Sequence, residues 1–437
     1  MEVNKETLPK GWTIAKFEDL LDYIQPTNYI VKSTDYKDTY PTPVLTAGKS
    51  FIKGYTNETD GIFTKLPTII FDDFTTATQF VNFPFKVKSS AMKILQPTCD
   101  LVNIKLAYYY MQTIHLKGET HKRFWISEYS QIPVPLAPLN EQKRILAKLE
   151  QLLTDLDKGI EYLETTKQQL KVYRESVLKW AFEGKLTNSV MNKEKIGGHS
   201  NLITKGASPK WQGFNYINDS SQLLFITSEN VRENYIDVSE PKYLSLGFND
   251  IQKRSILQKE DVLFNLVGAS IGRAAIFHLD QISNINQAVA IIRLKNSISN
   301  KYLSHYLNAE VAKQNYLEKV VDVARANLSL TDIGNMDVPL PTERTDQDRI
   351  VKEIESRLSV CDKIEETIVS SLQQAEALRL SIIKKAFEGR LVPQDPNDEP
   401  AEKLLERIRA AKGNGKPEKK ENAAKSKKSS KLKHATI

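Results

Sequence analysis

The chain has 437 residues, of which 40% are hydrophobic and 26% charged, so it can form more than one domain and has an ordinary soluble composition. No stretch approaches the ~18 consecutive apolar residues of a membrane span, and the amino terminus lacks the pattern of a secretory signal, so we expect a cytoplasmic protein. Cys99 and Cys361 are the two cysteines, and their separation argues against a disulfide framework or a zinc site.

The net charge of +7 lies at the end of the chain. Residues 411–437 contain nine lysines and two glutamates, so residues 1–410 carry no net charge. We expect the Lys-rich tail, 413–437, to be a disordered solvating segment, and an arm that grips DNA is the alternative.

The first segment in chain order, residues 1–139, has the pattern of a mixed α/β domain, which we call head 1. β-branched and aromatic runs such as PTIIFDDF (67–74) alternate with turn residues. An apolar helical stretch follows at 106–116. Fifteen basic and fourteen acidic residues leave this head almost neutral.

Residues 189–345, which we call head 2, repeat this order with a different sequence. A strand-like run, DVLFNLVG, covers 261–268, and a helical stretch is expected over 302–320. The two heads share little sequence, so two similar scaffolds with dissimilar surfaces are predicted.

A long helical segment follows each head and is nearly the same both times. EQKRI at 141–145 recurs as DQDRI at 346–350, and AFEGKL at 181–186 recurs as AFEGRL at 386–391, both with an offset of 205. Just upstream, ISEYSQIPVPL and LTDIGNMDVPL match with an offset of 204. A period of this length indicates two tandem copies of a domain with its helix, since solenoid repeats run ~20–50 residues.

Within both helical segments, which we call rod 1 and rod 2, apolar residues recur at alternating steps of four and three, a heptad pattern. A helix of about 44 residues would span roughly 65 Å, begin after Pro138 or Pro341 and end at Gly184 or Gly389. We predict that the two seams pair as one coiled coil; two amphipathic helices that each pack on their own domain are the alternative. The seam positions are Ile145, Leu149, Leu152, Leu156, Gly159, Leu163, Thr166, Leu170, Tyr173, Val177 and Trp180, and then Ile350, Ile354, Arg357, Cys361, Ile364, Ile368, Ser371, Ala375, Leu378, Ile382 and Lys385.

Motifs of catalysis are absent or incomplete. TAGKS (46–50) has Pro43 where a P-loop needs its first glycine, and the six histidines form no metal-binding pair. Asp72 and Asp73 could form part of a nuclease metal site, but neighbouring residues of a strand point to opposite faces, so a solvated loop is expected. The sequence therefore favours a binding protein without metal or cofactor.

These features together resemble the specificity subunits of type I restriction-modification systems. The resemblance covers about residues 8–412 and rests on VPLAPLNEQKRIL with VPLPTERTDQDRIV, on AFEGKL with AFEGRL, on LVPQDPNDEPAEKLLERI, and on ITKGASP, FITSENV and DVLFNLVGASIGRAAI in head 2. It implies an α+β protein in which two target recognition domains are separated by two long antiparallel helices that form a pseudo-twofold symmetric coiled coil.

The resemblance also implies the roles of the segments and partners. The family's subunits have no catalytic site; two methyltransferase subunits dock on them with S-adenosylmethionine, and restriction subunits bring ATP and Mg. In this chain we expect target recognition domain 1 at 1–139, conserved helix 1 at 140–188, target recognition domain 2 at 189–345, conserved helix 2 at 346–391, a linker with a short helix at 392–412 and the tail at 413–437.

Residues that could read DNA are polar side chains of the loops in each head, because Arg, Asn and Gln pair with base edges while Lys, Ser and Thr hold phosphates. For each of them a solvated loop or a structural turn is the alternative. The candidates are Thr46, Lys49, Lys53, Tyr55, Thr75, Thr76, Gln79, His121, Lys122 and Arg123 in head 1, and Thr227, Ser228, Asn230, Arg232, Ser270, Arg273, Asn286, Gln287, Arg325 and Asn327 in head 2.

The functional expectation is a subunit that binds double-stranded DNA and reads a bipartite target, one half-site per head. Two other classes are open. A coiled-coil scaffold with two protein-binding heads would explain the rods, and a fused methyltransferase and nuclease is disfavoured by the missing cofactor loops.

Overall fold

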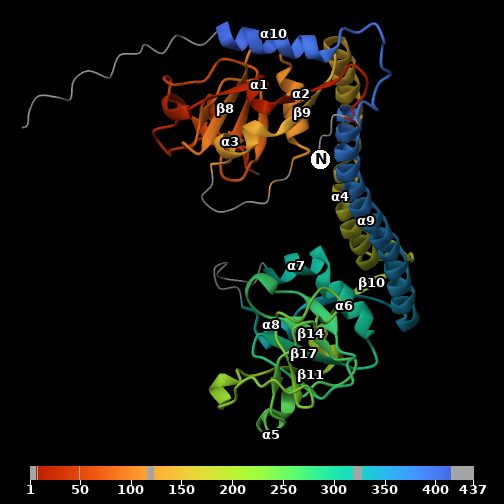
Figure 1. The fold of residues 1–437 in the computed structure, drawn as a ribbon. Helices are drawn as coiled ribbons and strands as arrows, with labels where there is room; N and C mark the ends of the chain where they lie inside the picture. Colours follow the sequence, from red (N-terminus) through yellow and green to blue (C-terminus); the bar gives the residue numbers. More distant parts are fainter. Residues whose placement is uncertain are drawn as a thin grey trace, which may run out of the picture. The chain divides into compact units, whose positions relative to one another are not determined.

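The computed structural model describes residues 6, 8–48, 50–114, 116, 123–317 and 327–414. The chain forms two compact units (Figure 1). Unit 1 consists of Met1–Glu161 and Leu372–Ile437, and unit 2 consists of Tyr162–Ser371. Each unit therefore contains one head together with part of both rod helices.

Unit 1 contains three sheets. β1 (Thr13–Lys16) pairs with β9 (Pro133–Leu136), so the start and the end of head 1 lie side by side. A second, antiparallel sheet has the order β2-β8-β5-β6, and a third has the order β4-β3-β7, in which β3 and β7 are parallel. The bounds are β2 Leu21–Ile24, β3 Thr42–Leu45, β4 Ile52–Thr56, β5 Thr68–Asp72, β6 Thr78–Val81, β7 Lys86–Val87 and β8 Met92–Pro97, with helices α1 (Phe17–Leu20), α2 (Ile104–Met111) and α3 (Phe124–Ser127).

Unit 2 repeats this topology strand for strand. β10 (Met191–Lys195) pairs with β18 (Asp337–Pro341), and the larger sheets have the orders β11-β17-β14-β15 and β13-β12-β16. β12 and β16 are parallel, as β3 and β7 are. The bounds are β11 Ser200–Lys205, β12 Leu223–Ile226, β13 Tyr243–Leu244, β14 Val262–Asn265, β15 Ala274–Ile276, β16 Ser283–Ile285 and β17 Val289–Leu294, with helices α5 (Phe248–Ile251), α6 (Asn300–Asn308), α7 (Glu310–Leu317) and α8 (Leu330–Gly334).

The central strands form because their residues are apolar on both faces. Ile69, Ile70 and Phe71 of β5 are fully buried, as are the first three residues of β14. Short β-branched and aromatic runs of this kind suit strands that are covered on both sides. The prediction of strands at 67–74 and 261–268 is confirmed.

The helical stretch predicted over 302–320 is helical in its described part, 302–317, where it consists of two helices, α6 and α7. The chain leaves the helical conformation at Ala309, between α6 and α7. The reason lies one residue earlier, because the Asn308 side chain accepts from the Ala274 N–H at 2.9 Å and donates to the Ala274 carbonyl at 2.8 Å. These bonds tie the end of α6 to β15.

The rods are single helices of the predicted length. α4 (Leu139–Phe182) and α9 (Arg344–Phe387) have 44 residues each and begin and end with the offset of 205. Gly184 and Gly389 follow them with φ of 78° and 68°, the left-handed conformation that glycine adopts at a helix end. An alanine at either position would also meet neighbouring backbone or proline atoms.

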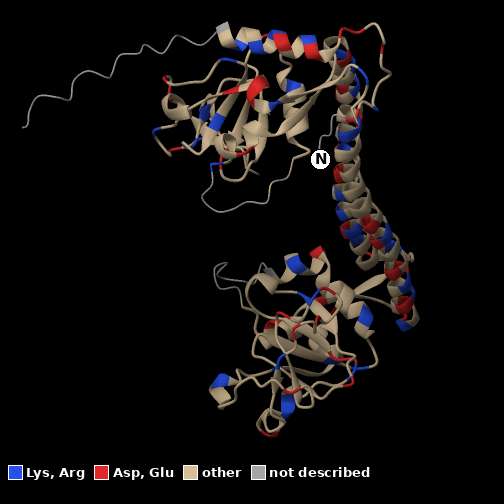
Figure 2. Ribbon diagram, in the orientation of Figure 1, with Lys and Arg blue, Asp and Glu red and all other residues tan. Residues whose placement is uncertain are grey.

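α4 and α9 pack against each other in both units, so the coiled-coil prediction is confirmed. In unit 1 Ile145 and Leu149 share a core with Ile383, while in unit 2 Phe182 shares a core with Ile354. Residues near the start of one helix contact residues near the end of the other, so the two helices are antiparallel within each unit. Basic and acidic residues are interspersed along both helices (Figure 2).

Two ion pairs show that the packing follows the duplication. In unit 2 Arg174 binds Asp362 at 2.6 Å, and in unit 1 Arg379 binds Asp157. Arg379 is the copy of Arg174, and Asp362 is the copy of Asp157. Each pair thus joins one copy of the arginine to the opposite copy of the aspartate, which is how identical helices pair antiparallel.

Toward the end of rod 1 the predicted seam is right at Leu170 and Val177, which are buried, and wrong at Tyr173 and Trp180. Tyr173 and Trp180 are 40% and 39% exposed, whereas Ala181 and Phe182 are buried. Ala181 and Phe182 belong to the core that contains Tyr302 and Tyr306 of head 2, so the end of α4 packs on that head. Leu378, the copy of Tyr173, is likewise 50% exposed.

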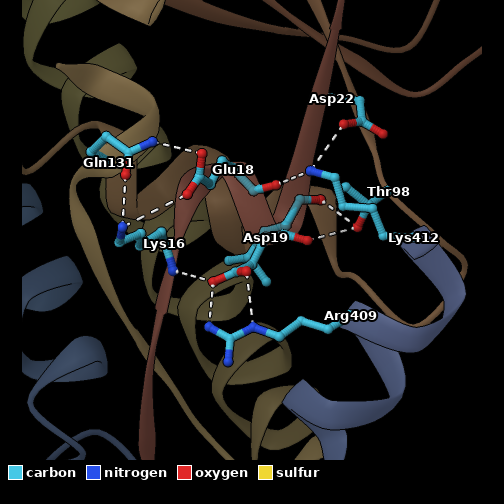
Figure 3. Close-up of polar contacts among 9 residues, drawn as sticks. Lys16, Glu18, Asp19, Asp22, Thr98, Gln131, Arg409 and Lys412 are labelled. Carbon is cyan, nitrogen blue, oxygen red and sulfur yellow. Dashed lines mark hydrogen bonds and ion pairs between the residues drawn. The ribbon is translucent and has the colours of Figure 1, made fainter. Parts of the chain in front are cut away.

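The carboxyl-terminal helix α10 (Ala401–Asn414) lies on head 1 (Figure 3). Leu404, Leu405 and Ile408 are buried in the core of unit 1. Arg409 forms two bonds of 3.0 Å with the Asp19 carboxylate of α1, and both this contact and the Arg409 guanidinium's charge act to hold the pKa of Asp19 down against the effect of burial. Helix α10 is thereby joined to α1 within unit 1.

Candidate DNA interface

The predicted DNA-reading loops of head 2 meet where β12, β14 and β16 end. The Asn286 N–H donates to the Ile226 carbonyl at 3.0 Å, which joins the loops after β16 and β12. Leu266 accepts from the Leu328 N–H at 3.0 Å, which brings Asn327 to the loop after β14. We call residues 227–232, 266–273, 286–288 and 327–328 the loop edge of head 2.

Asn265, the last residue of β14, holds this edge together. Its side-chain amide donates to the Ser228 carbonyl at 2.9 Å and to the Val231 carbonyl at 3.4 Å. The side chain is fully buried, and its oxygen has no hydrogen-bond partner in the described part of the chain. Asn265 is not among the residues predicted from the sequence, although a polar residue within the apolar run DVLFNLVG is a usable signal of a buried, hydrogen-bonded side chain.

Head 1 has the same edge, made by equivalent backbone bonds. Lys88 donates its N–H to Leu45 at 3.0 Å, as Asn286 does to Ile226. Phe124 donates to Asp73 at 2.9 Å, as Leu328 does to Leu266. The loop edge of head 1 therefore consists of residues 46–51, 73–77, 88–91 and 123–124, of which residue 49 is outside the described residues.

Most of the candidate residues lie at these two edges. Lys53, Tyr55 and Gln79 lie instead on strands β4 and β6, and Lys49, His121, Lys122 and Arg325 lie outside the described residues. The edges bring together Thr46, Thr75, Thr76 and Arg123 in head 1, and Thr227, Ser228, Asn230, Arg232, Ser270, Arg273, Asn286, Gln287 and Asn327 in head 2. Contact of any of these residues with DNA stays a prediction.

Their surroundings separate the candidates into two kinds. Thr75, Arg123, Gln287 and Asn327 are exposed. Thr227 and Asn230 are buried and bound to each other, because the Asn230 side-chain oxygen accepts from the Thr227 hydroxyl at 2.9 Å. The Asn230 amide also donates to the Asp237 carbonyl at 2.8 Å, so this side chain shapes its loop.

Several cations in or near the edges form no ion pair with an acidic residue of the described part of the chain. Among the described residues, Lys53, Arg123 and Arg273 form no ion pair, whereas Arg232 lies 3.4 Å from Asp237. Because each head is nearly neutral as a whole, phosphate binding needs unpaired cations that cluster on one side. At the edges themselves these cations are Arg123 in head 1 and Arg273 in head 2.

Asp73 contradicts the expectation of a solvated loop. Its side chain is 2% exposed and lies 3.5 Å from Lys93, which is 1% exposed. Its carboxylate also accepts from the Trp125 N–H at 2.8 Å. Asp73 thus orders the chain that follows Arg123, and among the described residues no group of three His, Cys, Asp or Glu could hold a metal.

Each head is fastened to the rods by the repeated AFEG end of the opposite copy. In unit 1 Tyr110 packs on Phe387 with a centroid distance of 4.9 Å, and in unit 2 Tyr306 packs on Phe182 at 5.1 Å. Phe387 belongs to the rod that follows head 2, and Phe182 to the rod that follows head 1. The duplication therefore supplies each head with the end of the other head's helix.

We call the contact between the tyrosine of each head and the rod phenylalanine, Tyr110 with Phe387 and Tyr306 with Phe182, the joint of that unit. The polar contacts at the two joints also correspond. The Tyr110 hydroxyl donates to the Pro133 carbonyl at 3.0 Å, and the Tyr306 hydroxyl donates to the Asp337 carbonyl at 2.7 Å. Burial raises the pKa of Tyr110 to about 12, so the hydroxyl keeps its proton. Two further ion pairs also correspond, Lys105 with Glu150 and Lys301 with Glu355.

No helix among the described residues combines the length and apolar character needed to cross a bilayer.

Comparison with protein families gives one result. The model described as "Type I restriction modification DNA specificity domain" matches twice, over residues 9–171 and 203–374. The two matches follow the duplication, since each includes a head and most of its rod.

Relatives and solved structures agree with this match. The chain is 31% identical over 414 residues to the EcoR124I/EcoR124II type I restriction enzyme specificity subunit of Escherichia coli, covering 88% of this chain and 93% of that protein. It is 31% identical over 305 residues to the EcoBI specificity subunit of Escherichia coli, covering 63% and 64% of the two chains.

Two solved structures share the fold at 16% identity. A structure described as "Structural basis underlying complex assembly and conformational transition of the type I R-M system" has a TM-score of 0.63 over 88% of this chain and 99% of that chain. The HsdS subunit from Thermoanaerobacter tengcongensis has a TM-score of 0.52 over 88% and 98%. With its duplicated heads, its packed rod helices and two matches to the specificity domain, the chain belongs to the family of type I restriction-modification DNA specificity subunits.

Proposed function

We propose that this subunit reads a bipartite sequence in double-stranded DNA, one half-site with each head. The observation that supports this proposal most directly is that two heads of the same strand topology present different side chains at equivalent loop edges. Arg123 of head 1 occupies the place of Asn327 of head 2, because each precedes the residue that bonds to the loop after the central strand. Arginine pairs best with guanine and asparagine with adenine, so equivalent positions would read different bases.

The rods are proposed to dock two methyltransferase subunits, and restriction subunits would join through them. Two identical partners need two equivalent surfaces, and α4 and α9 present copies of one helix. Large apolar side chains stay exposed on both rods, among them Tyr162 at 74% and Val172 at 61% on α4 and Val360 at 56% on α9. S-adenosylmethionine, ATP and Mg would be bound by those partners, and this chain would act without catalysis of its own.

Exchange of head 2 tests the reading function. Residues 189–345 are replaced by the corresponding head of another specificity subunit, and the methylated adenines are mapped by sequencing the host genome. We expect one half-site to change and the other to persist, because each head is fastened by its own joint. A change in both half-sites would contradict independent reading.

The protein-binding scaffold is tested in the same strain. The complex of this chain with its methyltransferase is assayed for retention of duplex DNA in a gel shift. Assembly of the complex without any DNA retention and without methylation would support the scaffold and refute DNA reading.

A further inference from the structure

A single tryptophan of head 2 is almost fully exposed. Trp211 is 84% exposed, the highest value among the exposed large hydrophobic side chains of the described residues. It lies on the short 3-10 turn Lys210–Gln212, which follows β11. Tryptophan buries more apolar area than any other side chain, so its exposure in the free protein suggests a surface that is covered in a complex.

The turn that carries Trp211 is firmly attached. The Pro209 carbonyl accepts from the N–H groups of Gln212 and Phe214, both at 2.9 Å. Gly213 has a φ of 79°, which allows the chain to reverse there. The Phe214 ring packs edge-on against the buried Phe248 at 5.4 Å. The indole is thus presented outward by a turn whose two ends are held.

The loop that carries the turn begins at the loop edge of head 2. β11 runs antiparallel to β17, and Lys205 pairs with Ala290, close to the loop 286–288. Gly206 follows, and its backbone lies so close to the Ile285 carbonyl that a Cβ atom there would come within 1.8 Å of it. The same Cβ would lie 2.8 Å from the Asn286 carbonyl. Lys205 and Gly206 therefore lie beside the candidate DNA interface, and the turn that carries Trp211 follows within a few residues.

The charge of this loop suits DNA. Lys205 and Lys210 are exposed, and neither forms an ion pair within the described part of the chain. Arg273 of the loop edge is likewise without an acidic partner there. Unpaired lysines beside an exposed aromatic ring are the combination that binds the sugar-phosphate backbone together with an apolar surface of nucleic acid.

We propose that residues 205–213 form an additional DNA contact of head 2, in which Trp211 packs on the sugar and base edges of the groove wall while Lys205 and Lys210 bind phosphates. This inference rests on the proposed reading of DNA and deepens it. The contact adds affinity without choosing bases, because apolar packing and phosphate binding carry little sequence information.

Head 1 offers nothing equivalent in its described residues. The corresponding loop follows β2 and includes Tyr29, Tyr36 and Tyr40, which are only partly exposed. The Tyr29 ring packs edge-on against Phe63 at 5.0 Å. The added contact therefore belongs to one half-site.

The experiment measures DNA affinity of the full chain in complex with its methyltransferase, on a duplex that contains the mapped target and on one that lacks it. Trp211→Ala should raise the Kd on the order of tenfold for both duplexes, and Trp211→Phe should restore most of the affinity. The double change Lys205→Ala with Lys210→Ala should lower the slope of log K against log salt by about two. The map of methylated sites should stay the same.

Matched controls lie outside residues 205–213 and outside the loop edge of head 2. Ile282→Ala removes an apolar side chain that is 57% exposed, and Lys253→Ala with Arg254→Ala removes two cations that form no ion pair among the described residues. These variants should leave both affinity and salt slope unchanged.

Three outcomes distinguish a failure of the additional DNA contact from a failure of the proposed function. Unchanged affinity of Trp211→Ala, with base reading intact, overturns the inference and leaves the proposed function standing. Weaker assembly with the methyltransferase, with the DNA affinity of the assembled complex unchanged, also overturns it, because the surface then serves a protein. No DNA binding by the unmodified complex refutes the proposed function itself.

Discussion

His305 occupies in head 2 the place of Tyr109 in head 1, each directly before the tyrosine that packs on the opposite rod's phenylalanine. The His305 side chain is 8% exposed, and its Nδ1 has no hydrogen-bond partner in the described residues. Burial lowers its pKa below 6.5, with Lys301 acting in the same direction and Glu355 of α9 opposing them. The surroundings of His305 in unit 2 therefore favour the neutral imidazole over the charged form.

The pH dependence of unit 2 follows from that lowered pKa. The unfolded chain binds the proton more tightly, so the contribution of His305 is present above pH ~6.5 and is lost as the pH falls through the lower folded-state pKa. Between pH 7.5 and 5.5 the urea midpoint of the protein should fall further than that of His305→Gln. Equal falls of the urea midpoint with pH in both proteins would rule out this role of His305.

Asp73 shows why single residues were the hardest to predict. Adjacent aspartates at the end of an apolar strand look like a loop exposed to water, but Asp72 is the last residue of β5, and its carboxylate accepts from the Phe74 N–H at 2.8 Å. Asp73 is buried because Lys93, twenty residues later, supplies the opposite charge. Pairing between strands is not visible in a local pattern.

At the scale of elements, the ends of α4 and α9 attach the heads to the rod helices. Because Phe387 belongs to the core of unit 1 and Phe182 to that of unit 2, each helix ends in the joint of the head that it does not follow. This crossing explains why the AFEG end occurs twice in one chain. A single copy would leave one head without the aromatic partner of its tyrosine.

Truncation of these rings should loosen one joint at a time. Phe387→Ala should cost about 3–5 kcal/mol and speed hydrogen exchange in α2, while Phe182→Ala should act on α6, because a buried phenylalanine leaves both lost contacts and a cavity. Leu378→Ala, which removes a side chain that is 50% exposed on α9, is the control and should change stability by less than ~0.5 kcal/mol. Faster exchange in the same head for both phenylalanine variants would disprove the crossed arrangement.

For the molecule as a whole, the rods are proposed to set the distance between half-sites. Deletion of 162–168 together with its copy 367–373 removes one heptad from each rod and spares the residues of both reciprocal ion pairs. At 1.5 Å per residue each helix loses about 10 Å, or about three base pairs of B-DNA at 3.4 Å per step.

The methylation map of this double deletion should therefore show the same half-sites with a spacer shorter by about three base pairs. Deletion of 162–168 alone is the control, because it shifts one helix against the other and should prevent methylation. An unaltered spacer in the double deletion would show that the rods do not measure DNA.

The sequence by itself determined what repeats along the chain: the two rods with their glycine ends, a strand-rich part followed by a helical stretch in each head, and the family, because heptads, caps and tandem copies are local or periodic signals. Only the tertiary structure decided which surfaces meet. It seated Phe182 and Phe387 in the joints of the opposite heads, split the helix at Ala309, buried Asp73 and Asn265, and gathered dispersed loops into one edge per head. The reason is physical, since such contacts join residues far apart in the sequence and their free energy depends on burial and on partners that no single stretch contains.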